Sequence, residues 1–213
     1  NACNEVNEAI SSMKKSFQLN HDNAPALLQL GNLYKDKKLF SKALDTYRKY
    51  QKLFPKHIEG FYNEGPLQLR NQRFKIGWDK YEIGLKNNSR CLVEGYHNEE
   101  KKLWDGKPFE GTLLVYGEQG IGDQIIFGTL LYDLKKIQKN IILKVNEKLV
   151  SFLKYNFKDI PIYSHNEEIP KNNYTKFISI GSLCKFFRRN ISDFTNKEFK
   201  KFKVKRKQYN LKE

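Results

Sequence analysis

The stretch from Thr112 to Phe127 decides the fold, and it reads Thr-Leu-Leu-Val-Tyr-Gly-Glu-Gln-Gly-Ile-Gly-Asp-Gln-Ile-Ile-Phe. Its first five residues form a short apolar run, which is typical of a buried strand. A glycine-rich loop follows at 117–123, and the apolar residues after it predict a helix over about 124–137. A strand, a loop and a helix in this order open a βαβ unit of a parallel sheet.

The rest of the chain after this stretch continues the alternation. Strands are expected at 140–145, 160–163 and 176–180, with a helix at 148–156 between the first two. From Gly111 to Glu213 there are 103 residues, which is room for roughly three βαβ units at about 30 residues each. The sequence therefore predicts a small Rossmann-like parallel α/β domain over 111–213.

Ahead of this domain the apolar and small residues recur at helical spacing, and they repeat along the chain. A shift of 34 residues brings Gly31 onto Gly65, Phe40 onto Phe74 and Tyr47 onto Tyr81. This period and residue order resemble the tetratricopeptide repeat (TPR). The prediction is the second helix of one repeat, then a full repeat, then a degenerate repeat, at residues 1–19, 24–57 and 58–87.

Small residues in this pattern let two antiparallel helices approach closely, and aromatic side chains fill the remaining gaps. An unrelated set of helical hairpins is the alternative. The period breaks after residue 88, where Asp105, Gly106 and Pro108 supply turn chemistry. The expected organisation is α + α/β: helical repeats at 1–90, a linker at 91–110 and the Rossmann-like domain at 111–213.

The net charge of +15 is a weak indication of nucleic-acid binding. Seven of the 39 basic residues are Arg, and Arg is the residue of bidentate phosphate and base contacts. Residues 1–90 carry 16 basic and 9 acidic groups, residues 91–185 carry 13 and 12, and residues 186–213 carry 10 and 3. The excess thus lies at the two ends, and no specific nucleic-acid partner is expected. The run 200–207 is expected to be a solvated charge run rather than a binding patch.

The loop 117–123 follows a strand and opens a helix, which is where open parallel sheets bind ligands. A P-loop would end in Gly-Lys-Ser/Thr, but Asp123 and Gln124 stand in those places. A dinucleotide fingerprint would need a third glycine where Ile125 stands, and Ile is too large for close helix–strand approach. Neither type of nucleotide site is expected.

The run from Trp104 to Phe127 resembles a third class of protein. It reads Trp-Asp-Gly-Lys-Pro-Phe-Glu-Gly-Thr-Leu-Leu-Val-Tyr and continues through Gly-Glu-Gln-Gly-Ile-Gly-Asp-Gln-Ile-Ile-Phe. It is similar to bacterial proteins that fuse TPR repeats to a glycosyltransferase family 9 (heptosyltransferase-like) domain. The similarity is strongest over about 60–130, is loose at Ile180-Gly-Ser-Leu183, and is not seen beyond.

This resemblance implies the N-terminal half of a GT-B fold and an inverting sugar transfer. Asp123 would be the general base, which takes the proton of an acceptor hydroxyl as its oxygen attacks the anomeric carbon of a nucleotide sugar. Gly120 and Gly122 would let the acceptor come close to the backbone. The expected substrate-binding residues are Glu118, Gln119, Gly120, Gly122 and Gln124.

Each of these assignments has a simpler alternative. Asp123 stands just before an apolar segment, so it could equally be the N-cap of the helix, and the two roles are compatible. The glycines could serve loop flexibility alone. The scattered His residues predict no metal site, and no cofactor is expected.

The resemblance also implies a nucleotide-sugar donor bound mainly by a second Rossmann-like domain, and a glycan or lipid-linked acceptor. No second strand–loop–helix series follows in this chain, so we expect a truncated protein that does not catalyse transfer by itself. The alternative is a TPR protein-interaction module with a non-catalytic α/β remnant. Its groove would receive an extended peptide at Asn32, Tyr34, Lys35 and Asn63. Three widely spaced Cys residues and the lack of a long apolar run favour the cytoplasm or the inner face of the membrane.

Overall fold

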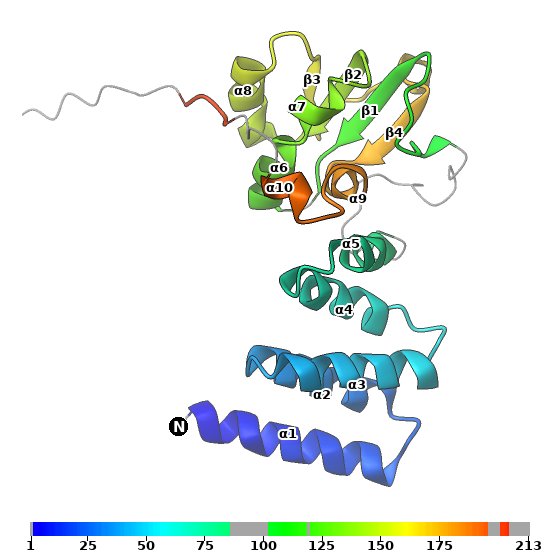
Figure 1. The fold of residues 1–213 in the computed structure, drawn as a ribbon, viewed down its shortest axis with the longest axis vertical. Coiled ribbons are helices and arrows are strands. Elements are labelled where there is room, and N and C mark those ends of the chain that lie inside the picture. The colour runs from blue at the N-terminus through cyan, green and yellow to red at the C-terminus, as the bar shows by residue number, and fades with distance from the viewer. Residues whose placement is uncertain (1, 86–101, 119, 196–200, 205–213) are drawn as a thin grey trace, which may run out of the picture. The chain divides into compact units, whose positions relative to one another are not determined.

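The computed structural model describes residues 2–85, 102–118, 120–195 and 201–204. The chain divides into two compact units, one of residues 1–89 with 189–191 and the other of residues 90–188 with 192–213. The first unit is helical and the second is built on a parallel sheet (Figure 1). The expected succession of helices and then a parallel sheet is thus confirmed.

The helical unit is a series of antiparallel neighbours in which each helix packs against the next (Figure 1). Asn23 is the N-cap of the second helix and accepts a hydrogen bond from the amide of Ala26 at 3.0 Å, as short polar side chains do at helix starts. The helices are α1 (Ala2–Leu19), α2 (Ala24–Asp36), α3 (Phe40–Leu53), α4 (Glu59–Arg70) and α5 (Phe74–Ile83).

The 34-residue period is visible in the turns between paired helices. Lys38 between α2 and α3 has a φ of 59°, and Gln72, 34 residues later between α4 and α5, has a φ of 58°. After each of them a backbone amide closes the turn, from Leu39 to the Tyr34 carbonyl at 2.8 Å and from Arg73 to the Gln68 carbonyl at 2.9 Å. The second helical hairpin therefore repeats the backbone of the first.

Close approach of the helices explains the small residues of the repeat. A Cβ added to Gly31 of α2 would lie 2.5 Å from a ring carbon of Tyr47 of α3, so only glycine leaves room for the ring. Tyr47 is fully buried, and its hydroxyl donates to Asn32 Oδ1 at 2.8 Å. The other buried members of this core are Ile10, Phe17, Ala24, Ala26, Leu27, Leu30, Tyr34, Ala43, Leu44, Tyr50 and Leu67.

The sheet unit has four parallel strands in the order β3-β2-β1-β4. They are β1 (Thr112–Tyr116), β2 (Asn140–Val145), β3 (Ile162–Ser164) and β4 (Lys176–Ser179). Leu113 of β1 pairs with Ile141 of β2 on one side and with Lys176 of β4 on the other. From β1 the chain builds outward to β2 and β3, and then returns to the far side of β1 with β4.

Short helices connect the strands and follow the last of them. They are α6 (Ile121–Gly128), α7 (Leu131–Leu134), α8 (Glu147–Asn156), α9 (Cys184–Phe187) and α10 (Ser192–Thr195), with 3₁₀ turns η2 (Lys171–Asn173) and η3 (Gly181–Leu183). Phe202 lies against the rings of Phe152, Phe157 and Tyr132. The side chain of Asn156 also bonds to the backbone of Lys203 at 2.7 and 3.2 Å, so residues 201–204 belong to this packing.

Two element predictions need correction. The helix expected at 124–137 begins three residues earlier and is interrupted between α6 and α7, where Thr129 Oγ1 donates to the Ile126 carbonyl at 2.7 Å. A hydroxyl that bonds back to the preceding turn competes with the helical ladder. The strand expected at 160–163 begins at Ile162, because Pro161 has no N–H to donate to a ladder.

Of the linker expected at 91–110, the structure describes residues 102–110, and these lie on the sheet. Leu103 forms a parallel bridge to Phe177 of β4, and the Trp104 amide donates to the Phe177 carbonyl at 3.0 Å. The Trp104 indole is buried edge-on against Phe186, and its N–H donates to the Lys107 carbonyl at 2.7 Å. This segment thus contributes to the core of the sheet unit.

Candidate functional site

The point at which the strand order reverses lies between β1 and β4. In an open parallel sheet a crevice forms there, outside the carboxyl ends of the two strands. The loop after β1, including Gly117 and Glu118, and the turn after β4, at Gly181–Leu183, meet at this edge. Gly117 and Glu118 therefore lie at the position where such sheets bind ligands.

Glu118 is buried at this edge, with 2% of its surface exposed. Its Oε1 accepts hydrogen bonds from Ser179 Oγ at 2.5 Å and from the Gly181 amide at 3.1 Å. A Cβ on Gly181 would run into the same carboxylate, so the glycine leaves the room that this contact needs. Glu118 thus joins the end of β1 to the end of β4 through its side chain, which faces protein rather than solvent.

Gln124 of α6 is fully buried and bonds to backbone on both sides. Its Nε2 donates to the Glu118 carbonyl, and its Oε1 accepts from the Asn146 amide at 2.9 Å. A Cβ on Gly117 would lie 2.5 Å from the Gln124 amide carbon, which explains the glycine at the end of β1. Gln124 therefore fixes α6 to the ends of β1 and β2.

Asp123 is exposed in the first turn of α6, whose N-cap is Gly120. The N-cap interpretation of Asp123 is therefore wrong, because the helix starts ahead of it. Its Oδ2 lies 2.5 Å from where a Cβ on Gly120 would stand, so the carboxylate folds back over the cap residue. Among the described residues its carboxylate has no hydrogen bond or ion pair, which leaves it available to a ligand.

Gly122 differs from the other loop glycines. A Cβ added there would have no atom within 4 Å, so no packing within the described chain requires a glycine at this exposed position. Gly122 and Asp123 are neighbours at the start of α6, whereas Glu118 and Gln124 face inward. Gln119 lies outside the described residues.

Two serines, one at the end of β4 and one in the turn after it, were not predicted as site residues. Ser179 bonds to Glu118, as described above, and Ser182 of η3 is buried with no partner for its Oγ among the described residues. An unpaired buried hydroxyl is uncommon and needs an explanation. The only sequence signal was the loosely matching run at 180–183, which named no role for either serine.

Farther along the same edge, His165 follows β3, and its buried Nε2 has no hydrogen-bond partner in the ranges that the structure describes. Burial and the neighbouring charge of Lys144 lower the pKa of its imidazole, and a hydrogen bond from the ring to the Lys144 backbone opposes this only in part. The ring is therefore neutral at pH 7. No group of three or more His, Cys, Asp or Glu side chains that could hold a metal ion occurs in the described part of the chain.

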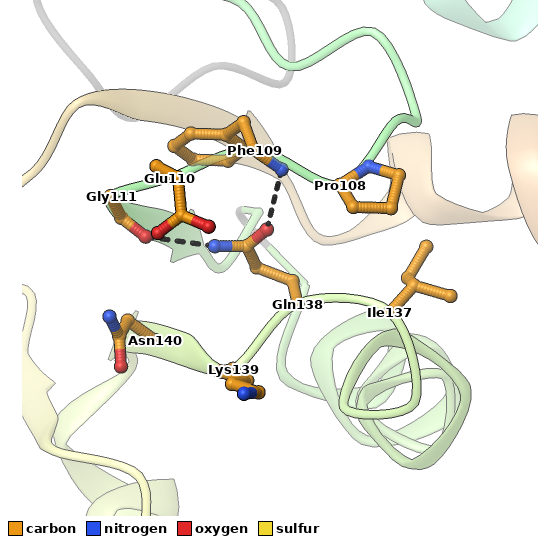
Figure 2. Close-up of a pocket in the computed structure, with 8 residues that line it drawn as sticks. All are labelled: Pro108, Phe109, Glu110, Gly111, Ile137, Gln138, Lys139 and Asn140. Carbon is orange, nitrogen blue, oxygen red and sulfur yellow. Dashed lines mark hydrogen bonds between the residues drawn. The ribbon is translucent and has the colours of Figure 1, made fainter.

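A hollow of about 410 Å³ opens at the opposite, amino-terminal edge of the sheet (Figure 2). Its walls are the segment before β1 and the segment that enters β2, with Gln138 between them. Gln138 donates to the Gly111 carbonyl at 2.9 Å and accepts from the Phe109 amide at 3.4 Å, as the dashed lines show. The buried amide of this pocket is thus used by the fold, and the hollow lies a strand's length from Asp123.

The residues of the expected peptide groove are mostly engaged within the helical unit. Asn63 Nδ2 donates to Asn32 Oδ1 at 3.2 Å and so joins α4 to α2. Tyr34 is buried, with the ammonium groups of Lys14 and Lys42 each 6.0 Å from its ring centre. Lys35 is half-exposed, with Asp36 at 3.8 Å. Asn32, Lys35 and Asn63 remain partly open to solvent.

None of the helices in the described ranges is both long and apolar enough to cross a membrane. No protein-family model matches the chain, and no curated protein sequence matches it. The geometry of the two units, together with the residues at the carboxyl edge of the sheet, is therefore the basis for any functional assignment.

Proposed function

We propose that the sheet unit is the Rossmann-like, acceptor-binding half of a family 9-like GT-B glycosyltransferase, and that TPR repeats precede it. The parallel order β3-β2-β1-β4 is the order of half a doubly wound sheet. The 34-residue repetition of helical hairpins is the period of TPR repeats. Both agree with the resemblance of residues 104–127 to this family.

The observation that carries the proposal is the exposed carboxylate of Asp123 beside the reversal point of the sheet, which has no hydrogen bond or ion pair within the described part of the chain. A general base must be ionised and within hydrogen-bond reach of the proton that it takes. Asp123 would accept the proton of an acceptor hydroxyl while the oxygen attacks the anomeric carbon of the donor. The bond from that carbon to the nucleoside diphosphate breaks, and the diphosphate leaves with the electron pair.

The inward-facing neighbours have a supporting role in this proposal. Glu118 and Gln124 hold the loop and α6 in place through hydrogen bonds to the Ser179 side chain and to backbone amides, so they position Asp123 rather than touch the acceptor. Gly122 leaves open space beside the base, where a sugar ring can approach the backbone. We also propose that the protein lies in the cytoplasm or at the inner face of the membrane, because its three Cys residues are widely spaced and form no disulfide pattern.

The test is a titration of the ¹⁵N-labelled chain with methyl α-D-glucopyranoside and methyl β-D-galactopyranoside, followed by amide chemical shifts. The proposal expects the largest shifts at 120–123 and 181–183. Shifts confined to other parts of the chain, or none up to the solubility limit of both glycosides, would remove it.

A protein-interaction module is the second candidate. This candidate is favoured because the side chains of Glu118 and Gln124 form hydrogen bonds within the protein. Few polar groups at the sheet edge then remain to bind a substrate. An extended acidic peptide would then bind across α2 and α4 near Asn32, Lys35 and Asn63. Fluorescence anisotropy with a fluorescein-labelled Asp-Glu repeat peptide tests this, with Lys35→Ala as the variant that weakens binding and Lys15→Ala as the exposed control. Equal affinity of both variants would contradict it.

A further inference from the structure

A buried polar cluster joins the two helical hairpins. Glu64 of α4 is 2% exposed, and it accepts hydrogen bonds from Gln51 of α3 at 2.7 Å and from Gln68 at 2.5 Å. Lys80 of α5 lies 2.7 Å from its Oε2 and also donates to Gln51 Oε1 at 3.2 Å. The partly exposed Arg48 of α3 is 3.6 Å from Oε1. We call Gln51, Glu64, Gln68 and Lys80 the Glu64 layer.

Each member of the Glu64 layer stands 34 residues after a buried residue of the preceding repeat. Gln51 follows Phe17, Glu64 follows Leu30, Gln68 follows Tyr34 and Lys80 follows Thr46. All four predecessors are at most 9% exposed, and three of them belong to the hydrophobic core of the unit. A connected polar layer thus lies one period after a mostly apolar one, while the turn of the second hairpin keeps the backbone conformation of the first.

This replacement has an energetic consequence. A buried ion pair is seldom more stabilising than apolar residues of similar volume, but loss of one partner leaves a buried charge uncompensated. The Gln68 Oε1 atom also has no hydrogen-bond partner among the described residues, so the layer is not fully satisfied. Its contribution to the packing of α4 and α5 therefore depends on the charge of Glu64.

We propose that the Glu64 layer is a charge-dependent coupling between the two hairpins: neutralisation of Glu64 releases α4 and α5 from α3 while α1–α3 stay packed. The apolar layer at Phe17, Leu30 and Tyr34 contains no titratable carboxylate, so the packing of α1, α2 and α3 is unaffected. Lys80 bridges α4 and α5 to Gln51 of α3 only while the carboxylate holds it in place.

The direction of the pH dependence follows from the surroundings of Glu64. Burial raises its pKa, but hydrogen bonds from Gln51, Lys80 and Gln68 and the charge of Lys80 outweigh burial and lower it. A carboxyl whose folded pKa is below its unfolded value stabilises the fold above the unfolded pKa, and this is lost as pH falls through the folded pKa. Release is therefore expected only at a pH below the ordinary pKa of a glutamate side chain.

Other charged groups lie on every helix packed against α4. On α3, the Asp45 carboxylate lies 3.9 Å from the guanidinium of Arg48, which is also near Glu64. At the start of α4, Glu59 interacts with Tyr50. On α2, Lys35 is near Asp36 rather than Glu64. His57 Nδ1 lies 3.2 Å from the Tyr50 hydroxyl. A variant confined to Glu64 separates its titration from all of these.

The experiment is hydrogen–deuterium exchange of the full chain, read from peptides of α4–α5 and of α2–α3, in the wild type and in Glu64→Gln. Rates are compared with those of the unprotected chain at each pH. Glu64→Gln is expected to lower the protection of α4–α5 by about tenfold or more at pH 7, with α2–α3 unchanged. The control Glu8→Gln makes the same chemical change at an exposed position of α1 and is expected to behave as wild type.

A second variant, Lys80→Met, tests the proposal even if Glu64→Gln fails to fold. Lys80→Met keeps the carboxylate but removes its main cation, so the release of α4–α5 is expected at higher pH than in the wild type. Unchanged protection of α4–α5 in Glu64→Gln, equal loss of protection in all five helices, or an unshifted release in Lys80→Met would each overturn the proposal.

Discussion

The Glu118 carboxylate accepts a hydrogen bond from Ser179 Oγ at 2.5 Å, across 61 residues of sequence. Ser179 is the last residue of β4, and Glu118 is the second residue after β1. Because these two strands flank the reversal point of the sheet, one buried contact sets the geometry of the whole candidate site. The same oxygen also accepts a hydrogen bond from the Gly181 amide, so one carboxylate oxygen accepts from two donors.

Glu118→Ala is expected to destabilise the sheet unit by about 2–4 kcal/mol, because it leaves two donors unpaired and opens a cavity. Glu118→Gln keeps an acceptor oxygen and is expected to lose about 1 kcal/mol. Urea unfolding followed by hydrogen exchange of β1 peptides measures both. A loss under about 0.5 kcal/mol for the alanine variant would show that the contact contributes little.

Gln124→Ala is expected to free the Asn146 amide and loosen the start of α6. The reason is that Gln124 bonds to backbone groups after both β1 and β2. Gln138→Ala is the matched control, since Gln138 makes a similar pair of backbone bonds at the other edge of the sheet. Hydrogen exchange at Asn146 should rise in the first variant alone, and a similar rise in both would contradict a local role.

The two glycines of the loop are expected to respond to alanine in opposite directions. Gly122→Ala meets open space in α6, so helix propensity predicts a gain of up to about 1 kcal/mol. Gly117→Ala would strike the buried Gln124 amide, and a loss of about 1–3 kcal/mol is expected from overpacking. Thermal denaturation measures both. Weakened glycoside binding by a stabilised Gly122→Ala would place the ligand at this glycine, whereas unchanged binding would exclude that position.

Much of the fold could be predicted from the sequence, because it depends on local periodicity. The alternation over 112–145 and the 34-residue spacing of Gly31 and Gly65 are both visible in the sequence without any knowledge of which side chains touch. The interruption of the helix after Gly128 could not be predicted. It depends on the Thr129 hydroxyl, which forms a hydrogen bond with the Ile126 carbonyl in the preceding turn.

The sequence predicted that the loop at 117–123 follows a strand and opens a helix, but not which way each of its side chains points. Loop composition indicates a ligand edge, yet it cannot tell that Glu118 and Gln124 point inward while Asp123 points outward. That distinction depends on contacts with Ser179 and Asn146, which are far away in sequence. No local pattern contains these pairings.

The buried pair of Arg188 with Asp133, at 2.9 Å, should make the sheet unit acid-sensitive. Burial raises the pKa of Asp133, but hydrogen bonds and charge from Lys136 and Arg188 outweigh it and lower the pKa. Its stabilisation is therefore present above the unfolded pKa and is lost as pH falls below about 4. Arg188→Met is expected to cost about 3 kcal/mol at pH 7 and to flatten this acid dependence, as urea midpoints at several pH values would show. An acid dependence equal to that of the wild type would contradict the assignment.

The most direct measurement of the central claim is the glycoside titration of Asp123→Asn beside Glu147→Gln. Glu147 is also an exposed first-turn carboxylate, placed after β2 instead of β1. If Asp123 holds an acceptor hydroxyl, Asp123→Asn weakens methyl glycoside binding by about tenfold, the usual effect of losing one charged hydrogen bond, and Glu147→Gln leaves it unchanged. Equal affinities for the wild type and both variants, with shifts away from 120–123, would contradict the account.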